Sequence, residues 1–286
     1  MPTKLGQNFL KDKSIIKKII QSADLQPDDF VIEVGPGEGV LTEELAKYVK
    51  KVIAIEIDGN LVQKLQKRFK NRENIEIIHE DILKINLKDL VISHQSSVNK
   101  YKVIANLPYY ITSPIIRLFL EAEIKPKEMI LMIQKEVAER IVAKPSEIPA
   151  ESRDAKRISR GKPGKMSILA VSVQYYAKPE LLFKVPKEAF SPIPKVDSAV
   201  IKITPNPTIL PLERGEIKGG VEEKQFFRLV RAGFCAKRKT LANNLSASLH
   251  LDKKMIEEKL RKLNLNSNVR AQELSLEKWK ELLKIL

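Results

Sequence analysis

A glycine-rich loop between an apolar run and a helical pattern constrains the fold of this chain more than any other part of its sequence. The largely apolar residues 30–34 lead directly into Gly35-Pro36-Gly37-Glu38-Gly39. Apolar residues then recur at helical spacing over 41–49, and a second β-branched run occupies 52–57. This order of strand, tight turn, helix and strand predicts a βαβ unit with two parallel strands.

The same alternation continues to residue 204 and predicts an α/β fold. Further strands are expected at 75–78, 102–105 and 129–133, and an amphipathic helix at 14–23. Strands separated by helices of this length predict a doubly wound parallel sheet. Residues 181–185 and 196–203 have only a Pro-rich connection between them and predict a β-hairpin that closes the sheet.

The end of the alternation predicts a domain boundary. Residues 205–222 mix Pro, Gly and Glu without periodicity and are interpreted as a linker. Residues 223–286 have helical spacing, with helices expected near 252–263 and 275–285. We therefore expect a Rossmann-like α/β domain over 1–204, followed by a small all-α domain.

The chain is strongly basic, and its excess charge is unevenly distributed. The formal net charge is +15 at pH 7, and residues 205–286 hold 17 basic against 10 acidic side chains. A second basic segment, 144–165, holds seven basic and three acidic residues. Because clustered Lys and Arg neutralise phosphates, this distribution favours an RNA partner, the alternative being a solubilising surface. The residues expected to contact RNA are Arg228, Arg231, Lys237, Arg238 and Lys239.

Cysteine and histidine usage argues against a disulfide and against a metal site. The single cysteine, Cys235, cannot form an intramolecular disulfide and is expected to be a packed thiol, and the three histidines lack metal-ligand spacing. No apolar stretch reaches the length of about 20 residues that a membrane-spanning helix needs. We expect a soluble, cytoplasmic protein without a metal, and a monomer, because nothing in the sequence indicates a dimer surface.

The glycine loop indicates a cofactor that contains a nucleoside and no phosphate. A helix that begins after such a loop presents unpaired N–H groups, and Gly35 and Gly37 let the main chain approach a ligand closely. Dinucleotides are typically bound by G-x-G-x-x-G, whereas the spacing here is G-x-G-x-G. Glu33 and Glu38 frame the loop and would repel a pyrophosphate. The expected cofactor is S-adenosylmethionine, with S-adenosylhomocysteine as the product.

Two acidic residues at strand ends are expected to contact this cofactor. Glu56 ends the second predicted strand, where a carboxylate can accept hydrogen bonds from both ribose hydroxyls. Asp81 lies just past the third strand, placed to accept from the adenine amino group. Either one alone could be a solvated loop acid, but open α/β sheets bind ligands at the carboxyl ends of strands, where both lie.

The tetrapeptide Asn106-Leu107-Pro108-Tyr109 follows the fourth predicted strand and is expected to bind the amine that accepts a methyl group. The Asn106 side-chain oxygen and the Leu107 carbonyl could each accept an amine N–H, which aims the nitrogen lone pair at the methyl group. Pro108 stiffens the turn, and Tyr109 offers a ring that can stack on an extruded base. Phe190 is expected to form the second wall of this pocket. The alternative for both aromatic residues is ordinary core packing.

Five motifs occur in a fixed order along nearly the whole chain. They are Gly6-Gln7-Asn8-Phe9-Leu10, Glu33-Val34-Gly35-Pro36-Gly37, Asn106-Leu107-Pro108-Tyr109, the segment from Phe190 to Ser198, and the segment from Arg238 to Leu245. Together they resemble the ribosomal RNA small-subunit adenine N6,N6-dimethyltransferase family, of the bacterial KsgA type.

The resemblance implies a class I methyltransferase and a specific substrate. It implies transfer of two methyl groups to each of two adjacent adenosines in the hairpin loop near the 3′ end of 16S rRNA, within an assembling small subunit. The cofactor contacts expected on this basis are Gln7, Asn8, Leu10, Gly35, Gly37, Glu56, Asp81 and Asn106.

One segment departs from this family, and three alternative functions stay open. Where the family usually has a short turn containing Gly and Tyr, the chain has the basic segment 146–165, interpreted either as an extra rRNA contact or as a solvated insertion. The alternatives are a 23S rRNA adenine methyltransferase of the macrolide-resistance type, a non-catalytic ribosome-assembly factor that binds RNA, and a DNA adenine methyltransferase. The basic helical tail, with its motifs at 238–245 and 270–275, favours the small-subunit enzyme.

Overall fold

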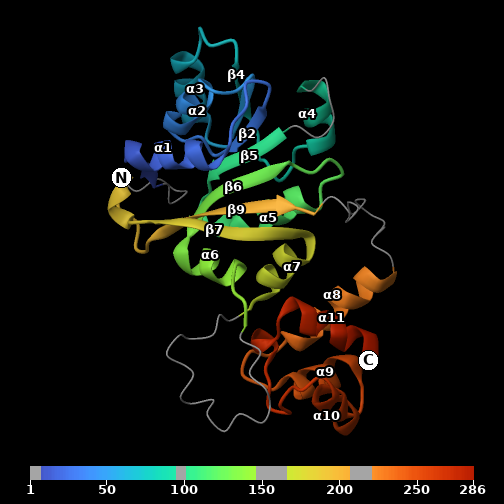
Figure 1. Ribbon diagram of the computed structural model, residues 1–286. Helices are drawn as coiled ribbons and strands as arrows, with labels where there is room; N and C mark the ends of the chain where they lie inside the picture. The colour runs from blue at the N-terminus through green and yellow to red at the C-terminus, as the bar shows by residue number, and fades with distance from the viewer. Residues whose placement is uncertain (1–7, 95–100, 146–165, 207–220) are drawn as a thin grey trace. The chain divides into compact units, whose positions relative to one another are not determined.

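The chain forms two compact units in the computed structural model (Figure 1). The structure describes residues 8–94, 101–145, 166–206 and 221–286. The first unit comprises 1–138 and 176–213, and the second comprises 139–175 and 214–286. Most of the predicted linker and nearly all of the basic segment 144–165 lie outside the described residues. Within the described part of the chain, no helix is both long enough and apolar enough to cross a membrane.

A seven-stranded sheet with the order β4-β3-β2-β5-β6-β9-β7 forms the centre of the first unit. Its strands are β2 (Phe30–Val34), β3 (Lys51–Glu56), β4 (Ile75–His79), β5 (Tyr101–Asn106), β6 (Glu128–Gln134), β7 (Ala177–Val185) and β9 (Ser198–Pro205). Strands β2 to β6 pair in parallel, and β9 and β7 add an antiparallel hairpin next to β6. The predicted doubly wound sheet with a closing hairpin is confirmed.

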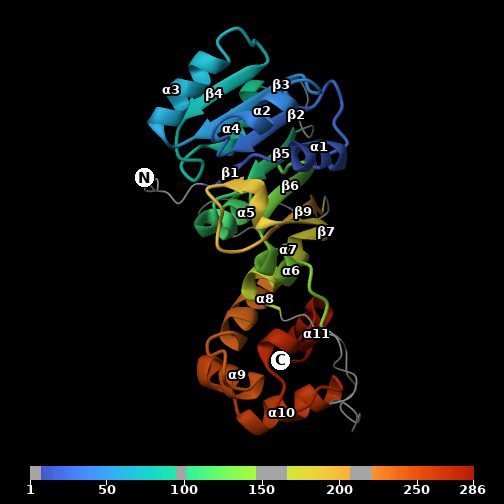
Figure 2. The same cartoon turned by 90° about the vertical axis from the view of Figure 1, so that its left-hand side faces the viewer.

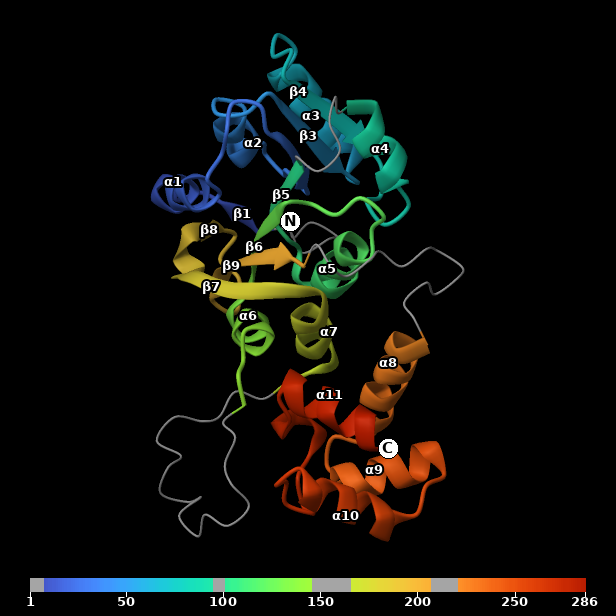
Figure 3. The same cartoon turned by 45° about the vertical axis from the view of Figure 1, so that its right-hand side comes forward.

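Helices cover both faces of this sheet. They are α1 (Lys13–Ser22), α2 (Val40–Leu45), α3 (Gly59–Arg68), α4 (Leu87–His94), α5 (Thr112–Leu120) and α6 (Lys135–Ile141). The apolar faces of α1, α2 and α3 share one buried cluster, and Figure 2 shows α2 and α3 side by side. Figure 3 places α4 and α5 on the other side of the sheet from α1 and α2. The short helix α4 was not predicted.

A second, two-stranded sheet joins segments that are far apart in the sequence. Strand β1 (Phe9–Leu10) pairs antiparallel with β8 (Phe190–Ser191), so that Leu10 lies opposite Phe190. Single-turn helices η1 (Tyr109–Ile111) and η2 (Lys187–Ala189) precede α5 and β8. The sequence did not predict this small sheet, because two-residue strands carry no periodic signal.

Side-chain caps determine where several helices begin. Asp12 accepts a hydrogen bond from Ser14 N at 2.8 Å ahead of α1, and Asp58 accepts from Asn60 N at 2.9 Å ahead of α3. A short polar side chain in this position satisfies an N–H group that has no partner within the helix. These two caps place the first turn of α1 directly after the loop that carries Lys11, and the first turn of α3 shortly after the end of β3 at Glu56.

The second unit is helical and has its own core. Its helices are α7 (Ile168–Tyr176), α8 (Val221–Gly233), α9 (Leu241–Leu249), α10 (Lys253–Lys262), the single turn η3 (Ala271–Glu273) and α11 (Leu276–Ile285). Helices α10 and α11 confirm the two helices predicted for the tail. Met166, Ala170 and Val171 belong to the same buried cluster as Phe226 and Trp279. This packing explains why 139–175, expected in the α/β domain, groups with the C-terminal helices.

Cys235 lies in the turn after α8 and is exposed, so the expectation of a packed thiol was wrong. Its Sγ donates toward Asn244 Oδ1 at 3.4 Å, and Ser248 Oγ lies 3.4 Å from the same sulfur. The turn runs along the surface of the helical unit, which leaves the thiol partly accessible.

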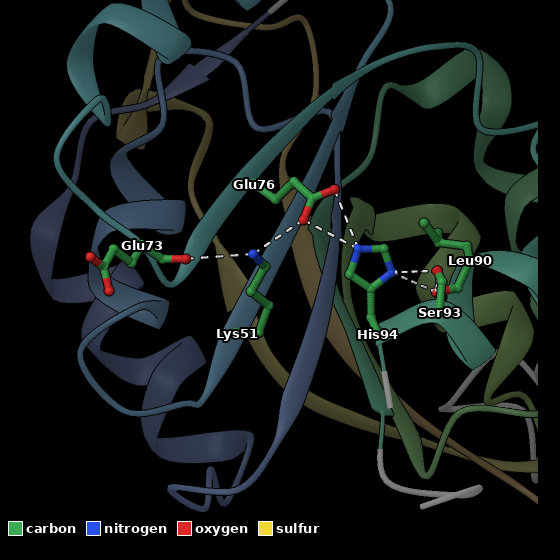
Figure 4. Close-up of polar contacts among 6 residues, drawn as sticks. All are labelled: Lys51, Glu73, Glu76, Leu90, Ser93 and His94. Atoms are coloured by element: carbon green, nitrogen blue, oxygen red, sulfur yellow. Dashed lines mark hydrogen bonds and ion pairs between the residues drawn. The ribbon is translucent and has the colours of Figure 1, made fainter. Parts of the chain in front are cut away.

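A polar cluster attaches α4 to the edge of the sheet (Figure 4). Glu76 of β4 pairs with Lys51 Nζ at 3.1 Å and with His94 Nε2 at 3.2 Å. The ring of His94 also stacks on Phe30, and its Nδ1 lies 2.8 Å from the Leu90 carbonyl oxygen. Partial burial disfavours the charged carboxylate, but Lys51 and His94 outweigh it and hold the pKa of Glu76 below its ordinary value.

A buried ion cluster joins α1 to the amino ends of the central strands. Lys102 of β5 is fully buried and donates to the carbonyl oxygens of Ala23 at 2.7 Å and Asp24 at 2.6 Å. Its Nζ also lies 2.9 Å from Asp29 Oδ2 and 3.1 Å from Glu128 Oε1. A buried cation with this many acceptors is fully satisfied, and its removal would leave two buried carboxylates without it.

We expect Lys102→Met to lower the free energy of unfolding of the first unit by about 3–5 kcal/mol, the usual cost of breaking a buried ion pair. Urea and thermal unfolding followed by circular dichroism would measure the loss. Lys202→Met is the matched control, because Lys202 Nζ pairs with the same Glu128 at 2.5 Å but its side chain is 27% exposed. An equal loss in both variants would contradict the prediction.

Candidate active site

A cavity of about 220 Å³ lies at the carboxyl ends of β2, β3, β4 and β5. Every described residue that the sequence assigned to the cofactor or the methyl acceptor lines it: Asn8, Leu10, Gly35, Gly37, Glu56, Asp81, Asn106, Leu107, Pro108, Tyr109 and Phe190. Gln7 lies outside the described residues. The parallel strands therefore bring these separate segments to one edge of the sheet.

The glycine loop lies against the cavity with its backbone in the left-handed region. Gly37 has φ +58°, and an added Cβ would lie 3.0 Å from the ring of Phe9. Gly39, with φ +78°, is the N-cap of α2, and a Cβ there would lie 2.7 Å from both Leu65 of α3 and Phe69, the C-cap of α3. A larger residue at either position would be strained and would press on a neighbour. Glycine therefore leaves the main chain of this loop free to approach a ligand.

Glu56 is a buried carboxylate held in one orientation. Its Oε1 accepts from Ile57 N at 2.9 Å and Asp58 N at 3.0 Å, and its Oε2 accepts from Gly37 N at 3.3 Å. Burial raises its pKa above the ordinary value, and the three backbone donors oppose that rise. The carboxylate thus joins the end of β3 to the glycine loop and presents fixed acceptors at the cavity.

The acidic frame of the loop is less negative than its sequence suggests. Glu33 is buried, and desolvation, together with the nearby charge of Glu56, raises its pKa to about 8, against a smaller opposing effect of Thr42. Its Oε2 has no hydrogen-bond partner among the described residues. Glu38 pairs with Lys11 Nζ. At neutral pH the frame is thus mostly a neutral carboxyl and a paired carboxylate, which weakens the expected repulsion of a pyrophosphate.

Asp81 lies just beyond β4 and lines the cavity, half-buried. Its Oδ1 accepts from Leu83 N at 3.0 Å, which fixes the turn that carries it. No group of three or more His, Cys, Asp or Glu side chains suited to a metal ion occurs within the described ranges.

Asn106 ends β5 and faces the cavity with its side-chain amide. Its Nδ2 donates to the Asn8 carbonyl oxygen at 3.4 Å, which leaves Oδ1 as the acceptor available to a ligand. The N–H of Leu107 donates to Met132 O at 3.0 Å, and its side chain is buried. Pro108, with φ −56°, then turns the chain into η1. This hydrogen bonding keeps the tetrapeptide in place beside β6.

Two aromatic residues line the same cavity. Tyr109 begins η1, and its hydroxyl lies 3.0 Å from Ser198 Oγ. Phe190 is 4% exposed and also belongs to the main buried cluster of the first unit. Cavity lining and core packing, the two interpretations of Phe190, therefore both apply.

The N-terminal segment covers the glycine loop, a feature that the sequence did not reveal. Phe9 lines the cavity, and Lys11 Nζ lies 5.9 Å from the centre of its ring. The Ala189 carbonyl accepts from Lys11 N at 2.9 Å and from Asp12 N at 3.3 Å. The only sequence signal for Phe9 was its place inside the first of the five motifs.

The five basic residues expected to contact RNA lie on the second unit. Arg228 and Arg231 are on α8, and the other three, Lys237, Arg238 and Lys239, are in the turn before α9. All five are exposed, and none has an acidic partner among the residues that the structure describes. Asn244 holds this turn, since its Nδ2 donates to Gly233 O at 2.6 Å and Ala236 O at 3.0 Å. The turn thus presents exposed cations on a fixed backbone.

Comparison with known proteins gives matches over both units. A family model described as ribosomal RNA adenine dimethylase matches residues 1–286. Ribosomal RNA small subunit methyltransferase A of Dehalococcoides mccartyi is 44% identical over 279 residues, covering 97% of this chain and 86% of that protein. The protein of the same name from Alkaliphilus metalliredigens is 41% identical over 283 residues, covering 98% and 90%.

Two solved structures share this fold over nearly their full length. The 23S rRNA methyltransferase ErmE is 26% identical with a TM-score of 0.69, covering 98% of this chain and 99% of that one. A dimethyladenosine transferase from Plasmodium falciparum is 26% identical with a TM-score of 0.68, covering 96% and 95%.

We expect the buried Glu33 to make stability depend on pH. A glutamate in the unfolded chain titrates near about pH 4.3, so between there and the folded value of about 8 the folded protein holds a proton that the unfolded chain has lost. The free energy of unfolding therefore falls as the pH rises across this window. Glu33→Gln removes this effect, so the variant should gain melting temperature over the wild type at pH 8.5 and lose that advantage toward pH 5.

Melting temperatures measured from pH 5 to pH 9 would check this, with Glu73→Gln, an exposed carboxylate, as the control. A difference between Glu33→Gln and the wild type that stays constant over this range would contradict the assignment of Glu33 as a buried neutral acid.

Proposed function

The chain belongs to the ribosomal RNA adenine dimethylase family, and on that premise we propose that it dimethylates adenosines in 16S rRNA. The substrate is the pair of adjacent adenosines in the 3′-terminal hairpin loop, within an assembling small subunit. Each exocyclic amine receives two methyl groups. We further propose that the protein acts as a cytoplasmic monomer without a metal.

The observation that carries this proposal is a single cavity shared by the amine-binding tetrapeptide and the cofactor-binding acids. Asn106, Glu56 and Asp81 come from the ends of three different strands and all line it. A protein that only bound RNA would have no need for a buried, oriented carboxylate beside an available amide oxygen.

The residues of the cavity fit S-adenosylmethionine. Glu56 would hold the ribose hydroxyls, Asp81 the adenine amino group, and Gly35 and Gly37 the methionine part, with Asn8 and Leu10 covering them. No Lys or Arg is among the described residues that line the cavity, which suits a cation better than a pyrophosphate. When bound, the cofactor supplies a methyl group on a cationic sulfur and leaves as S-adenosylhomocysteine.

The tetrapeptide and the two aromatic residues would orient the acceptor. Asn106 Oδ1 and the Leu107 carbonyl accept the two amine N–H groups, so the nitrogen lone pair turns out of conjugation. Tyr109 and Phe190 hold the extruded base between their rings. The amine proton is released to water, because a nitrogen that has gained a methyl group in this way is strongly acidic.

The second transfer places a further demand on Asn106. After the first methyl group is added, the amine keeps a single N–H, so one of the two acceptors loses its partner. We propose that Asn106 Oδ1 holds the remaining N–H, because the Asn8 carbonyl fixes its amide.

The helical unit would supply rRNA affinity. Its exposed cations suit phosphate contacts, since none has an acidic partner among the described residues: Arg228, Arg231, Lys237, Arg238 and Lys239. The basic segment 146–165, a further candidate for rRNA binding, lies outside the described residues. The sequence relatives at 41% and 44% identity carry small-subunit names, whereas the 23S enzyme is 26% identical, which favours 16S over 23S rRNA.

We expect the purified protein to form N6,N6-dimethyladenosine in undermethylated small subunits and none in undermethylated large subunits. Asn106→Ala should lower the rate at least about 100-fold, the usual effect of losing a group that acts in the transition state. Labelled S-adenosylmethionine and mass spectrometry of RNA digests would measure both. Asn60→Ala, an exposed residue of α3, is the control. Product in 23S rRNA would replace the proposal with the resistance-type enzyme, and RNA binding without product would favour an assembly factor.

We expect the combined variant Lys237→Ala, Arg238→Ala and Lys239→Ala to bind small subunits less tightly and with a weaker salt dependence. The slope of log K against log salt concentration should fall by about one for each phosphate that these side chains no longer neutralise. The matched control replaces Lys254, Arg261 and Lys262 of the α10 region, which are also exposed cations. Equal slopes in the two triple variants would remove the turn from the RNA-binding surface.

A further inference from the structure

The hydroxyl of Tyr109 is held by Ser198, a residue of the antiparallel hairpin. Ser198 Oγ lies 3.0 Å from Tyr109 Oη, and the Ser198 side chain is fully buried. Either oxygen can donate, and one O–H···O hydrogen bond joins the two hydroxyls. Tyr109 is half-buried and lines the cavity, so this bond fixes the outer end of a ring that otherwise turns about its side-chain bonds.

The antiparallel hairpin explains why Ser198 can reach this ring. Ser198 is the first residue of β9 and lies opposite Gln134, the last residue of β6. A parallel strand would begin at the far edge of the sheet, but an antiparallel strand begins at the edge where its neighbour ends. Ser198 therefore lies at the carboxyl edge, two strands from the end of β5 that carries the tetrapeptide.

The backbone around Ser198 is fixed from several directions. The backbone carbonyl of Asp197 accepts a hydrogen bond from Lys135 N at 3.0 Å. The side-chain Oδ1 of Asp197 accepts one from Lys187 N at 3.2 Å. Ser198 is also paired with Val185 on the β7 side. The Ser198 hydroxyl is therefore carried by a fixed backbone. Residues 197 and 198 also hold the segment that leads to Phe190.

We propose that Ser198 is a positioning residue that sets the angle of the Tyr109 ring for stacking on the target base, and that the second methyl transfer depends on it most. The proposal rests on the proposed function. Before the first transfer, two N–H groups and the stacked rings hold the base. After it, one N–H is gone, and stacking carries a larger share of the orientation.

A purely structural role for this bond gives a different result. If the two hydroxyls only satisfied each other, their loss would affect folding, or both transfers equally. A change in the ratio of monomethyl to dimethyl product separates the two interpretations, since stability alone does not change it.

The test compares Ser198→Ala, Tyr109→Phe and the double variant, with Thr204→Ala at the exposed end of β9 as the control. The assay follows monomethyladenosine and dimethyladenosine over time in undermethylated small subunits. The affinity for S-adenosylmethionine and the melting temperature are measured in parallel. Tyr109→Phe removes the same bond without touching the strand, so it tests the proposal if Ser198→Ala folds poorly.

We expect both single variants to slow the second transfer by about three- to tenfold, consistent with the loss of one hydrogen bond, and to accumulate monomethyladenosine. In both single variants the first transfer should slow less than the second, and in Ser198→Ala the cofactor affinity should change by less than about twofold. The double variant should be no slower than either single variant, and Ser198→Thr should restore most of the second rate.

Additive losses in the double variant, or equal slowing of both transfers, would overturn this role for Ser198. A wild type that yields no dimethyladenosine in small subunits would instead overturn the proposed function, so the two failures are distinguishable.

Discussion

The parallel pairing of β2 to β6 determines where chemistry can take place in this protein. Parallel strands end at one edge, and the strand ends and loops at this edge supply the glycine loop, Glu56, Asp81 and Asn106. The antiparallel hairpin also reaches this edge, because β9 runs opposite to β6 and begins where β6 ends. The site therefore depends on strand direction first and on individual side chains second.

The cavity of the first unit and the exposed cations of the second unit differ in charge. The cavity of the first unit is lined by acids and amide oxygens, with Glu33 mostly neutral and Glu56 fixed by three N–H groups. The second unit exposes cations on α8 and on the turn before α9 that have no acidic partner in the described part of the chain. One chain can therefore bind a cationic small molecule and a polyanion without their competing for the same side chains.

Apolar runs predicted the buried central strands, and helical spacing of apolar residues predicted helices such as α1 and α3. The strand 30–34 and the hairpin were placed correctly, and the described residues predicted for the site line one cavity because motifs at strand ends converge in this fold. Short-range patterns could not give β1 and β8, whose pairing joins residues almost the whole α/β unit apart. The ionisation states of Glu33 and Glu38 could not be predicted from the sequence either, because the two residues look alike in sequence and only Glu33 is buried. The grouping of 139–175 with the tail also came from packing on Phe226 that no local pattern encodes.

The carbonyl of Ala189 accepts the N–H groups of Lys11 and Asp12 and directly precedes Phe190. One oxygen atom therefore holds the segment that covers the glycine loop next to Phe190, which lines the methyl-acceptor side of the cavity. Two ligands that both favour this arrangement are thermodynamically coupled. If the first ligand raises the affinity for the second by some factor, the second raises the affinity for the first by the same factor. If S-adenosylmethionine and the RNA loop both favour this arrangement, each binds more tightly when the other is already bound.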